Sequence, residues 1–382
     1  MNRISYITSL WETIREADLR PLRDQALRGV RIAIIGQPGS GRSTLAEKMR
    51  RDPSRPQLST DAPLLILDLD SASQAAGADL IILMLDSRQA DTSREQELVR
   101  GWQNANRRVL VFINAFESPQ QQMAISPWTS AGRRRIVMGS PLDERFLQDQ
   151  FAAAVVEILP DLVLGLGRYF PLFRLAIAHY LINDTCFSNA AYSLSTGLAE
   201  TVAILNIPLA LADTIVLTKT QAFLVYKLGL ALGYSTRWQD YIAEFGGVLG
   251  SSFFWRQLAR SLVGLIPFWG IVPKTAIAYS GTYVVGNVVL QWYLTGKHLS
   301  KGQMKLLYAQ ARARGSSLAS NLLQRLPRPR LRKRLPKPRP ATRKARSLPK
   351  PSRVQQCSNC GKVSAADASF CQYCGKPFDK TV

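Results

Sequence analysis

The chain has 382 residues, of which 46% are hydrophobic, so it is long enough for two or three domains with buried cores. Its formal net charge of +22 is concentrated, because 13 Lys and Arg and no Asp or Glu lie between Gln324 and Arg353. The five cysteines argue against a disulfide framework, since four cluster as two pairs and Cys186 stands alone in an apolar stretch. This usage indicates a reducing compartment and a metal site.

Residues 1–29 are expected to form one N-terminal amphipathic helix, or two, that pack on the following domain. They lack the continuous apolar stretch and the small-residue cleavage site of a secretory signal, so no such signal is expected. Pro21 is expected to break the helix. The apolar residues at roughly helical spacing are Ile4, Ile7, Leu10, Trp11, Ile14, Leu19, Leu22 and Leu27.

Five short apolar runs follow, separated by polar stretches that are compatible with helices. Runs that are hydrophobic on both faces are what a parallel sheet covered by helices requires. Residues 30–158 are therefore expected to form an α/β domain with a mostly parallel sheet. The runs are RIAII (31–35), PLLILD (63–68), DLIILMLD (79–86), RVLVFIN (108–114) and RIVM (135–138).

The segment GQPGSGRST (36–44) lies between the first run and a helical pattern, which is the setting of a phosphate-binding loop. Its glycines allow backbone angles that turn amide groups inward, and a helix N-terminus favours phosphate. Arg42 stands where a lysine is expected, and its planar guanidinium fits poorly against the β- and γ-phosphates. Ser43 is a candidate Mg²⁺ ligand. The alternative is a glycine-rich strand-to-helix turn without a ligand. The candidate nucleotide-binding residues of the loop are Gly36, Gly39, Gly41, Arg42, Ser43 and Thr44.

These features resemble an Era/TrmE-like bacterial GTPase domain of the P-loop NTPase class, with degenerate motifs, over roughly residues 30–158. The resemblance implies a purine nucleotide, GTP or GDP with Mg²⁺, as the ligand. In LILDLDSAS it implies that Asp68 is the carboxylate on the metal side, while Ser71 replaces the family's glycine, so the γ-phosphate sensor is lost. GADLIILMLDSR matches the family's fourth strand and ends at Asp86.

The motif that gives this family its guanine specificity, Asn-Lys-x-Asp, becomes NAFE here. Asn114 is kept, Ala115 replaces the lysine, and Glu117 replaces the aspartate that grips the base, so we expect weakened guanine selectivity. Only 24 residues separate Ser43 from Asp68, which leaves little room for a first switch loop and the edge strand after it. Thr60 is the only nearby threonine for the switch. The resemblance thus implies weak binding and slow or absent hydrolysis.

Residues 159–312 are expected to form an all-α hydrophobic domain. IPLALADTIVLTKTQAFLVYKLGLALGY and GLIPFWG...GTYVVGNVVLQWYLTG resemble the helical domain of unknown function that follows the GTPase domain in the YcjF-like bacterial family. Residues 261–296 carry one charge, Lys274, between flanking basic residues. Two interpretations stay open: a membrane hairpin with both ends facing the cytoplasm, or a soluble bundle of buried helices. His179 is interpreted as a packed helix residue rather than a ligand.

Residues 313–353 are expected to form an extended, disordered linker, because proline alternates with basic residues and self-repulsion opposes a packed core. One interpretation is a solvated spacer. The other is an electrostatic contact with anionic lipid or with nucleic acid. The linker contains no aromatic residue, so base stacking has no support there.

Residues 354–382 contain two Cys-x-x-Cys pairs, each followed by Gly-Lys, and resemble a short bacterial zinc ribbon. Four thiolates supply a closed tetrahedral zinc site, and Gly361 and Gly375 permit the tight turns that aim backbone amides at sulfur. With four protein ligands, the zinc has no open position for catalysis. The predicted ligands are Cys357, Cys360, Cys371 and Cys374.

Two functional hypotheses follow. In the first, the chain is a GTPase-like protein on the inner face of the cell membrane, with nucleotide as a structural or regulatory ligand. In the second, the α/β domain is vestigial, and a non-enzymatic scaffold binds a protein partner through the zinc ribbon and anionic partners through the linker. The sequence leaves open whether the chain is an enzyme. Nucleotide-dependent thermal stabilisation separates the two hypotheses.

Overall fold

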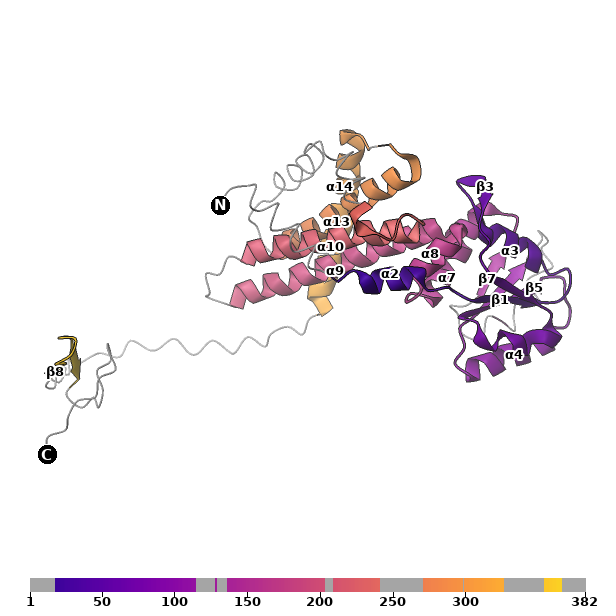
Figure 1. Ribbon diagram of the computed structural model, residues 1–382, viewed down its shortest axis with the longest axis horizontal. Coiled ribbons are helices and arrows are strands. Elements are labelled where there is room, and N and C mark those ends of the chain that lie inside the picture. Colours follow the sequence, from indigo (N-terminus) through magenta and orange to yellow (C-terminus); the bar gives the residue numbers. More distant parts are fainter. Residues whose placement is uncertain are drawn as a thin grey trace, which may run out of the picture. The chain divides into compact units, whose positions relative to one another are not determined.

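The computed structural model describes residues 18–114, 128, 136–202, 209–240, 271–297, 299–325 and 354–365. The chain divides into two compact units, residues 1–326 and 327–382. The described elements of the first unit (Figure 1) are α2 (Arg20–Leu27), β1 (Ile32–Gly36), α3 (Arg42–Arg50), β2 (Arg51–Asp52), β3 (Arg55–Ser59), β4 (Leu64–Leu67), η1 (Leu69–Gly77), β5 (Leu80–Asp86), α4 (Ser93–Asn104), β6 (Val109–Asn114), β7 (Ile136–Gly139), α6 (Glu144–Phe146), η3 (Leu147–Phe151), α7 (Ala152–Ile158), α8 (Val163–Tyr169), η4 (Pro171–Phe173), α9 (Arg174–Val202), α10 (Leu209–Ala231), α13 (Ile271–Thr295) and α14 (Lys301–Arg325). Those of the second unit are β8 (Val354–Gln356) and β9 (Val363–Ala365).

The predicted parallel sheet is confirmed, and each of the five apolar runs forms one of its strands. The strand order is β4-β1-β5-β6-β7, and all neighbours are parallel. Alternate side chains serve two cores: Ile32 and Ile34 of β1 pack with α3 and η3, whereas Ala33 and Ile35 pack with η1 and α4. Helices thus cover both faces of the sheet, which explains why its strands are apolar throughout.

Among the described residues, the segment between α3 and β4 adds no edge strand to the sheet. The segment between α3 and β4 forms a separate antiparallel hairpin, β2–β3. Strand β4 therefore ends the sheet, and its Leu65 and Ile66 are 44% and 41% exposed.

The β2–β3 hairpin and the residues after it are attached to the helical part of the same unit. Arg174 at the start of α9 pairs with Asp52 of β2 at 3.0 Å, and both side chains are mostly buried. The Thr60 hydroxyl donates to the Tyr169 carbonyl at the end of α8, at 2.8 Å. Two separate contacts thus fix the ends of this segment against the helices, while β3 itself stays exposed.

The long helices α9, α10 and α13 pack side by side (Figure 1). A small polar cluster joins the three helices. Asn189 of α9 donates to the Thr282 hydroxyl of α13 and accepts from the Thr220 hydroxyl of α10, each at 2.8 Å. None of the helices described has both the length and the apolarity needed to cross a bilayer. Residues 261–270 of the candidate hairpin lie outside the described residues.

The sheet and the helices share one hydrophobic core. A chain of phenylalanine rings leads from β6 to the start of α9: Phe112 lies 5.4 Å from Phe151, and Phe151 lies 5.7 Å from Phe173, between ring centroids. All three side chains are fully buried. Leucines of α10 and Val285 and Val289 of α13 belong to the same core cluster.

Two local expectations differ from the structure. Pro21 is not one of them: it lies in the first turn of α2, where proline needs no amide hydrogen, and residues 1–17 of the predicted N-terminal helical segment lie outside the described residues. Helix α14 runs to Arg325, into the predicted linker, since its composition suits a helix and the first proline beyond it is Pro327. His179 lies on α9 as expected, but its side chain is exposed.

Candidate functional site

The loop between β1 and α3 has the backbone of a phosphate cradle. Gly39 and Gly41 have left-handed φ angles of +84° and +98°, which favour glycine. A Cβ on Gly36 would lie 2.5 Å from the Met84 carbonyl oxygen of β5, so a side chain there would clash. Gly41 immediately precedes α3, whose N-terminal amides face the loop. The predicted strand, loop and helix are therefore present in this order.

Ser40 adds a feature that the sequence reasoning missed. Its side chain is 2% exposed, and among the described residues its Oγ has no hydrogen-bond partner. A Cβ built on Gly36 would lie 2.8 Å from this oxygen, so the hydroxyl points across the inside of the loop. A buried hydroxyl without a partner is costly unless something else binds it. The feature of the sequence that could have indicated this is the position of Ser40 between two glycines of the loop.

Asn114 holds the loop from the neighbouring strand. At the end of β6 it is 4% exposed, and its Nδ2 donates to the Ser40 carbonyl at 3.1 Å. A Cβ on Gly41 would lie 2.9 Å from that nitrogen, so this glycine also makes room for the contact. Asn114 is thus brought to the loop, where it orients backbone. Ala115 and Glu117 lie outside the described residues.

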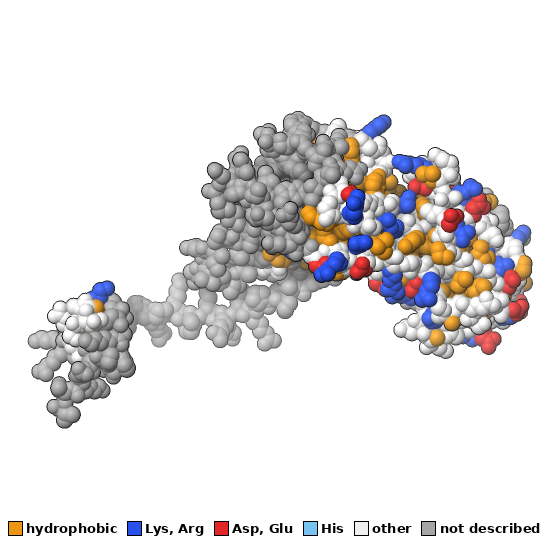
Figure 2. Space-filling view, in the orientation of Figure 1, with side chains coloured by type: hydrophobic (Ala, Val, Ile, Leu, Met, Phe, Trp, Pro, Cys, Tyr) orange, Lys and Arg blue, Asp and Glu red, His pale blue; other side chains and the backbone are white. Residues whose placement is uncertain are grey.

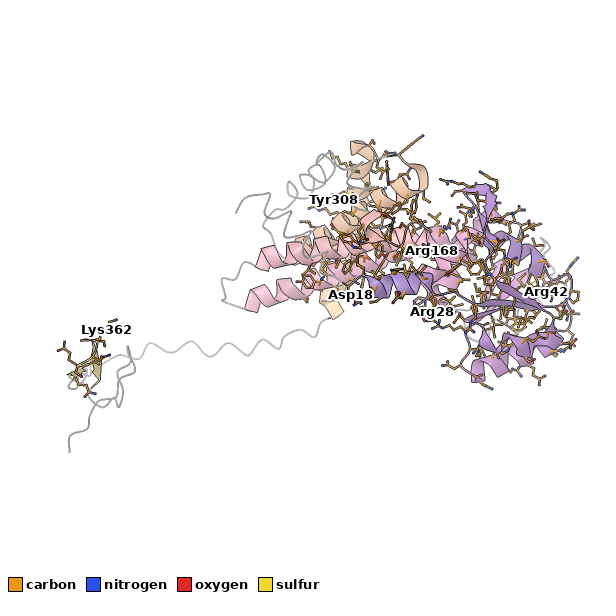
Figure 3. All side chains as sticks on the ribbon, in the orientation of Figure 1. Asp18, Arg28, Arg42, Arg168, Tyr308 and Lys362 are labelled. Atoms are coloured by element: carbon orange, nitrogen blue, oxygen red, sulfur yellow. The ribbon has the colours of Figure 1, made fainter. Side chains whose placement is uncertain are left out.

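Arg42 does not extend over the loop, as a phosphate ligand would; it turns toward the end of β4 (labelled in Figure 3). Its Nη1 lies 2.8 Å from the Asp68 carboxylate and donates to the Leu67 carbonyl at 2.5 Å. The Arg42 side chain is 14% exposed, whereas Asp68 is 58% exposed. Two residues predicted as separate nucleotide ligands are therefore paired with each other.

The other predicted site residues do not all lie at the loop. Ser43 is exposed in the first turn of α3, and Thr44 beside it is half-buried. Thr60 is bonded to the Tyr169 carbonyl, so its proposed switch role is not supported by its position. Ser71 lies in η1, with its amide donating to the Asp68 carbonyl at 3.0 Å. Arg88 donates to Asp86 and holds the pKa of that carboxyl below its usual range.

A second network that the sequence did not reveal ties the loop to α4. Glu95 is 1% exposed and accepts from the side-chain amides of Gln37 at 2.8 Å and Gln89 at 2.7 Å. Gln37 follows Gly36 in the loop, so the network fixes the loop to the α4 segment. This network could not be predicted, because glutamine and glutamate in a polar segment form no periodic pattern.

The described half of the predicted zinc site contains Cys357 and Cys360. They lie in a turn between β8 and β9, where the Gly361 amide donates to the Cys357 carbonyl at 2.8 Å and Gly361 has a φ of +71°. This tight turn fits the predicted role of Gly361, and Cys357 is buried while Cys360 is exposed. Cys371, Cys374 and Gly375 lie outside the described residues, and the described part alone holds no group of three metal-binding side chains.

Comparison with known proteins adds no family: no family model matches the chain, and no curated protein matches it. The fold alone therefore defines a broad class of protein. A five-stranded parallel sheet with helices on both faces, followed by a helical region, is consistent with an α/β P-loop-like fold.

Proposed function

We propose that the loop 36–44 binds the phosphates of a purine nucleotide weakly, and that the protein hydrolyses it slowly or not at all. The observation that carries this proposal is the buried hydroxyl of Ser40, which points into a loop of left-handed glycines at the start of α3. Such a loop presents amide hydrogens and a helix N-terminus to an anion. The Ser40 hydroxyl is a further hydrogen-bond donor, because none of the described residues accepts a hydrogen bond from it.

Slow turnover follows from what surrounds the cradle. Hydrolysis needs groups that stabilise charge on the transferred phosphoryl group and orient the attacking water. Thr60 is bonded to the Tyr169 carbonyl, and the Ser71 amide donates to the Asp68 carbonyl, so neither predicted switch position presents a group to the γ-phosphate or to the attacking water. A nucleotide bound here therefore acts as a structural or regulatory ligand of a unit whose sheet and helices share one core.

The test is thermal stabilisation of the full-length protein by GTP, GDP and ATP. A ligand that binds only the folded state raises stability by about 2.7 kcal/mol at a hundred times its Kd. Ser43→Ala and Gly41→Val should remove the shift, and Ser59→Ala, a serine on the exposed strand β3, should keep it. If every nucleotide leaves the melting temperature unchanged, the proposal fails. GTP turnover at an ordinary switch-GTPase rate would refute slow hydrolysis.

The second candidate function is that of a scaffold whose ribbon and linker bind partners. The turn at Cys357 and Cys360 favours it, because a zinc-held ribbon is a rigid module without catalytic positions. Under this proposal the α/β fold persists as a support for the helices. A partner captured equally well by the wild type and by Gly41→Val, with no effect of nucleotide, would favour this function over the first.

A further inference from the structure

The position of Arg42 determines which counter-charge the proposed phosphate site offers. Arg42 is the first residue of α3, so its backbone lies at the loop, and its guanidinium reaches β4. There it meets the carboxylate of Asp68, which is more than half exposed. The Arg42 side chain is only 14% exposed and also donates to the Leu67 carbonyl, so the pair opens only for a stronger acceptor, such as a phosphate that takes two parallel hydrogen bonds.

The residues that would hold Mg²⁺ do not fit the ion. Mg²⁺ prefers an octahedron of oxygens and takes one or two carboxylates beside water and phosphate. The resemblance and the loop suggest three donors, Ser43, Asp68 and Thr60. The Asp68 charge is neutralised by Arg42, and the Thr60 hydroxyl donates to the Tyr169 carbonyl. Of the three, only the Ser43 hydroxyl, exposed in the first turn of α3, is left.

We propose that the loop binds nucleotide phosphates without a divalent cation, and that the Arg42 guanidinium takes the place of the metal as counter-charge. This inference rests on the proposed function. A guanidinium pairs with phosphate through two parallel hydrogen bonds, and it is weakly hydrated, so it suits this role. In the free protein Asp68 occupies that guanidinium. Asp68 therefore competes with the phosphate and weakens nucleotide binding.

The experiment measures the Kd of GDP for the full-length protein by calorimetry, in metal-free buffer with and without added Mg²⁺. No chelator is used, so that zinc stays in the ribbon. We expect the two Kd values to agree within about threefold. Strengthening by Mg²⁺ of more than about threefold overturns the inference and leaves the proposed function standing. Failure of GDP, GTP and ATP to bind under either condition overturns the proposed function instead.

Two variants and a control test the competition itself. Asp68→Asn should tighten GDP binding by about two- to fivefold, because the carboxylate no longer competes for Arg42, and should leave it independent of Mg²⁺. Arg42→Gln should weaken binding in both buffers. Asp70→Asn removes a neighbouring carboxylate that pairs with Arg94 and should change neither. Weaker binding by Asp68→Asn with unchanged circular dichroism would show that Asp68 serves a metal and not Arg42.

Discussion

Phe151 joins the sheet to the helices, and its replacement tests whether the two parts unfold together. The ring is fully buried and stands between Phe112 of β6 and Phe173 of η4. Truncating a buried phenylalanine to alanine costs about 3–5 kcal/mol, because the transfer free energy is lost and a cavity remains. Both aromatic contacts are lost as well, so we expect Phe151→Ala to fall in the upper half of that range.

Hydrogen exchange followed by mass spectrometry measures this loss peptide by peptide. In Phe151→Ala, peptides from β6 and from α9 should lose protection by the same free energy, since one core serves both. Phe187→Ala is the matched control: this phenylalanine also lies on α9, but it is 48% exposed, and its loss should cost no more than about 0.5 kcal/mol. A variant in which α9 loosens while β6 keeps its full protection would refute a shared core.

Three further predictions concern other parts of the chain. Burial raises the pKa of the Cys186 thiol to about 12, so at pH 8 iodoacetamide should label it only after unfolding in urea; rapid labelling of the native protein would contradict its burial. About one equivalent of zinc should copurify, and Cys360→Ser should unfold residues 354–382 alone; a zinc content near zero would end this prediction. Truncation at Leu323 should abolish salt-sensitive binding to anionic vesicles and to nucleic acid, because the 13 basic residues carry it; unchanged binding would leave the linker as a spacer.

The distribution of basic residues along the chain supports the prediction about the linker. On the face of the first unit shown in Figure 2, basic side chains are interspersed with acidic ones and with apolar surface. The remaining +9 of net charge, which is 22 minus 13, is spread over the rest of the chain. A full-length variant with the linker bases changed to glutamine is the control that separates loss of charge from loss of the ribbon.

The strands were predictable because a strand that is buried on both faces needs apolar residues at nearly every position. In a run such as DLIILMLD, apolar residues follow one another without alternating polar ones. Strand β5 spans all of this run except its first residue. The loop was predictable because only glycine tolerates its backbone. The partners of Arg42 and Thr60 were not predictable, since these contacts join residues 25 and 109 positions apart and depend on the packing of whole elements. Helix α14 was missed in part because charge without proline does not stop a helix.

The shared core also sets an order of events during synthesis. The sheet is complete in sequence at Gly139, yet the core over one of its faces includes Leu230 of α10, Leu232 directly after that helix and, still later, residues of α13. At roughly 5–20 residues per second, the stretch from Ile158 to Leu232 takes about 4 to 15 seconds to emerge. Throughout that interval, the part of this core that α3, η3 and α7 do not cover stays exposed on the nascent α/β segment. The helices are thus the late half of a folding unit that begins with the sheet.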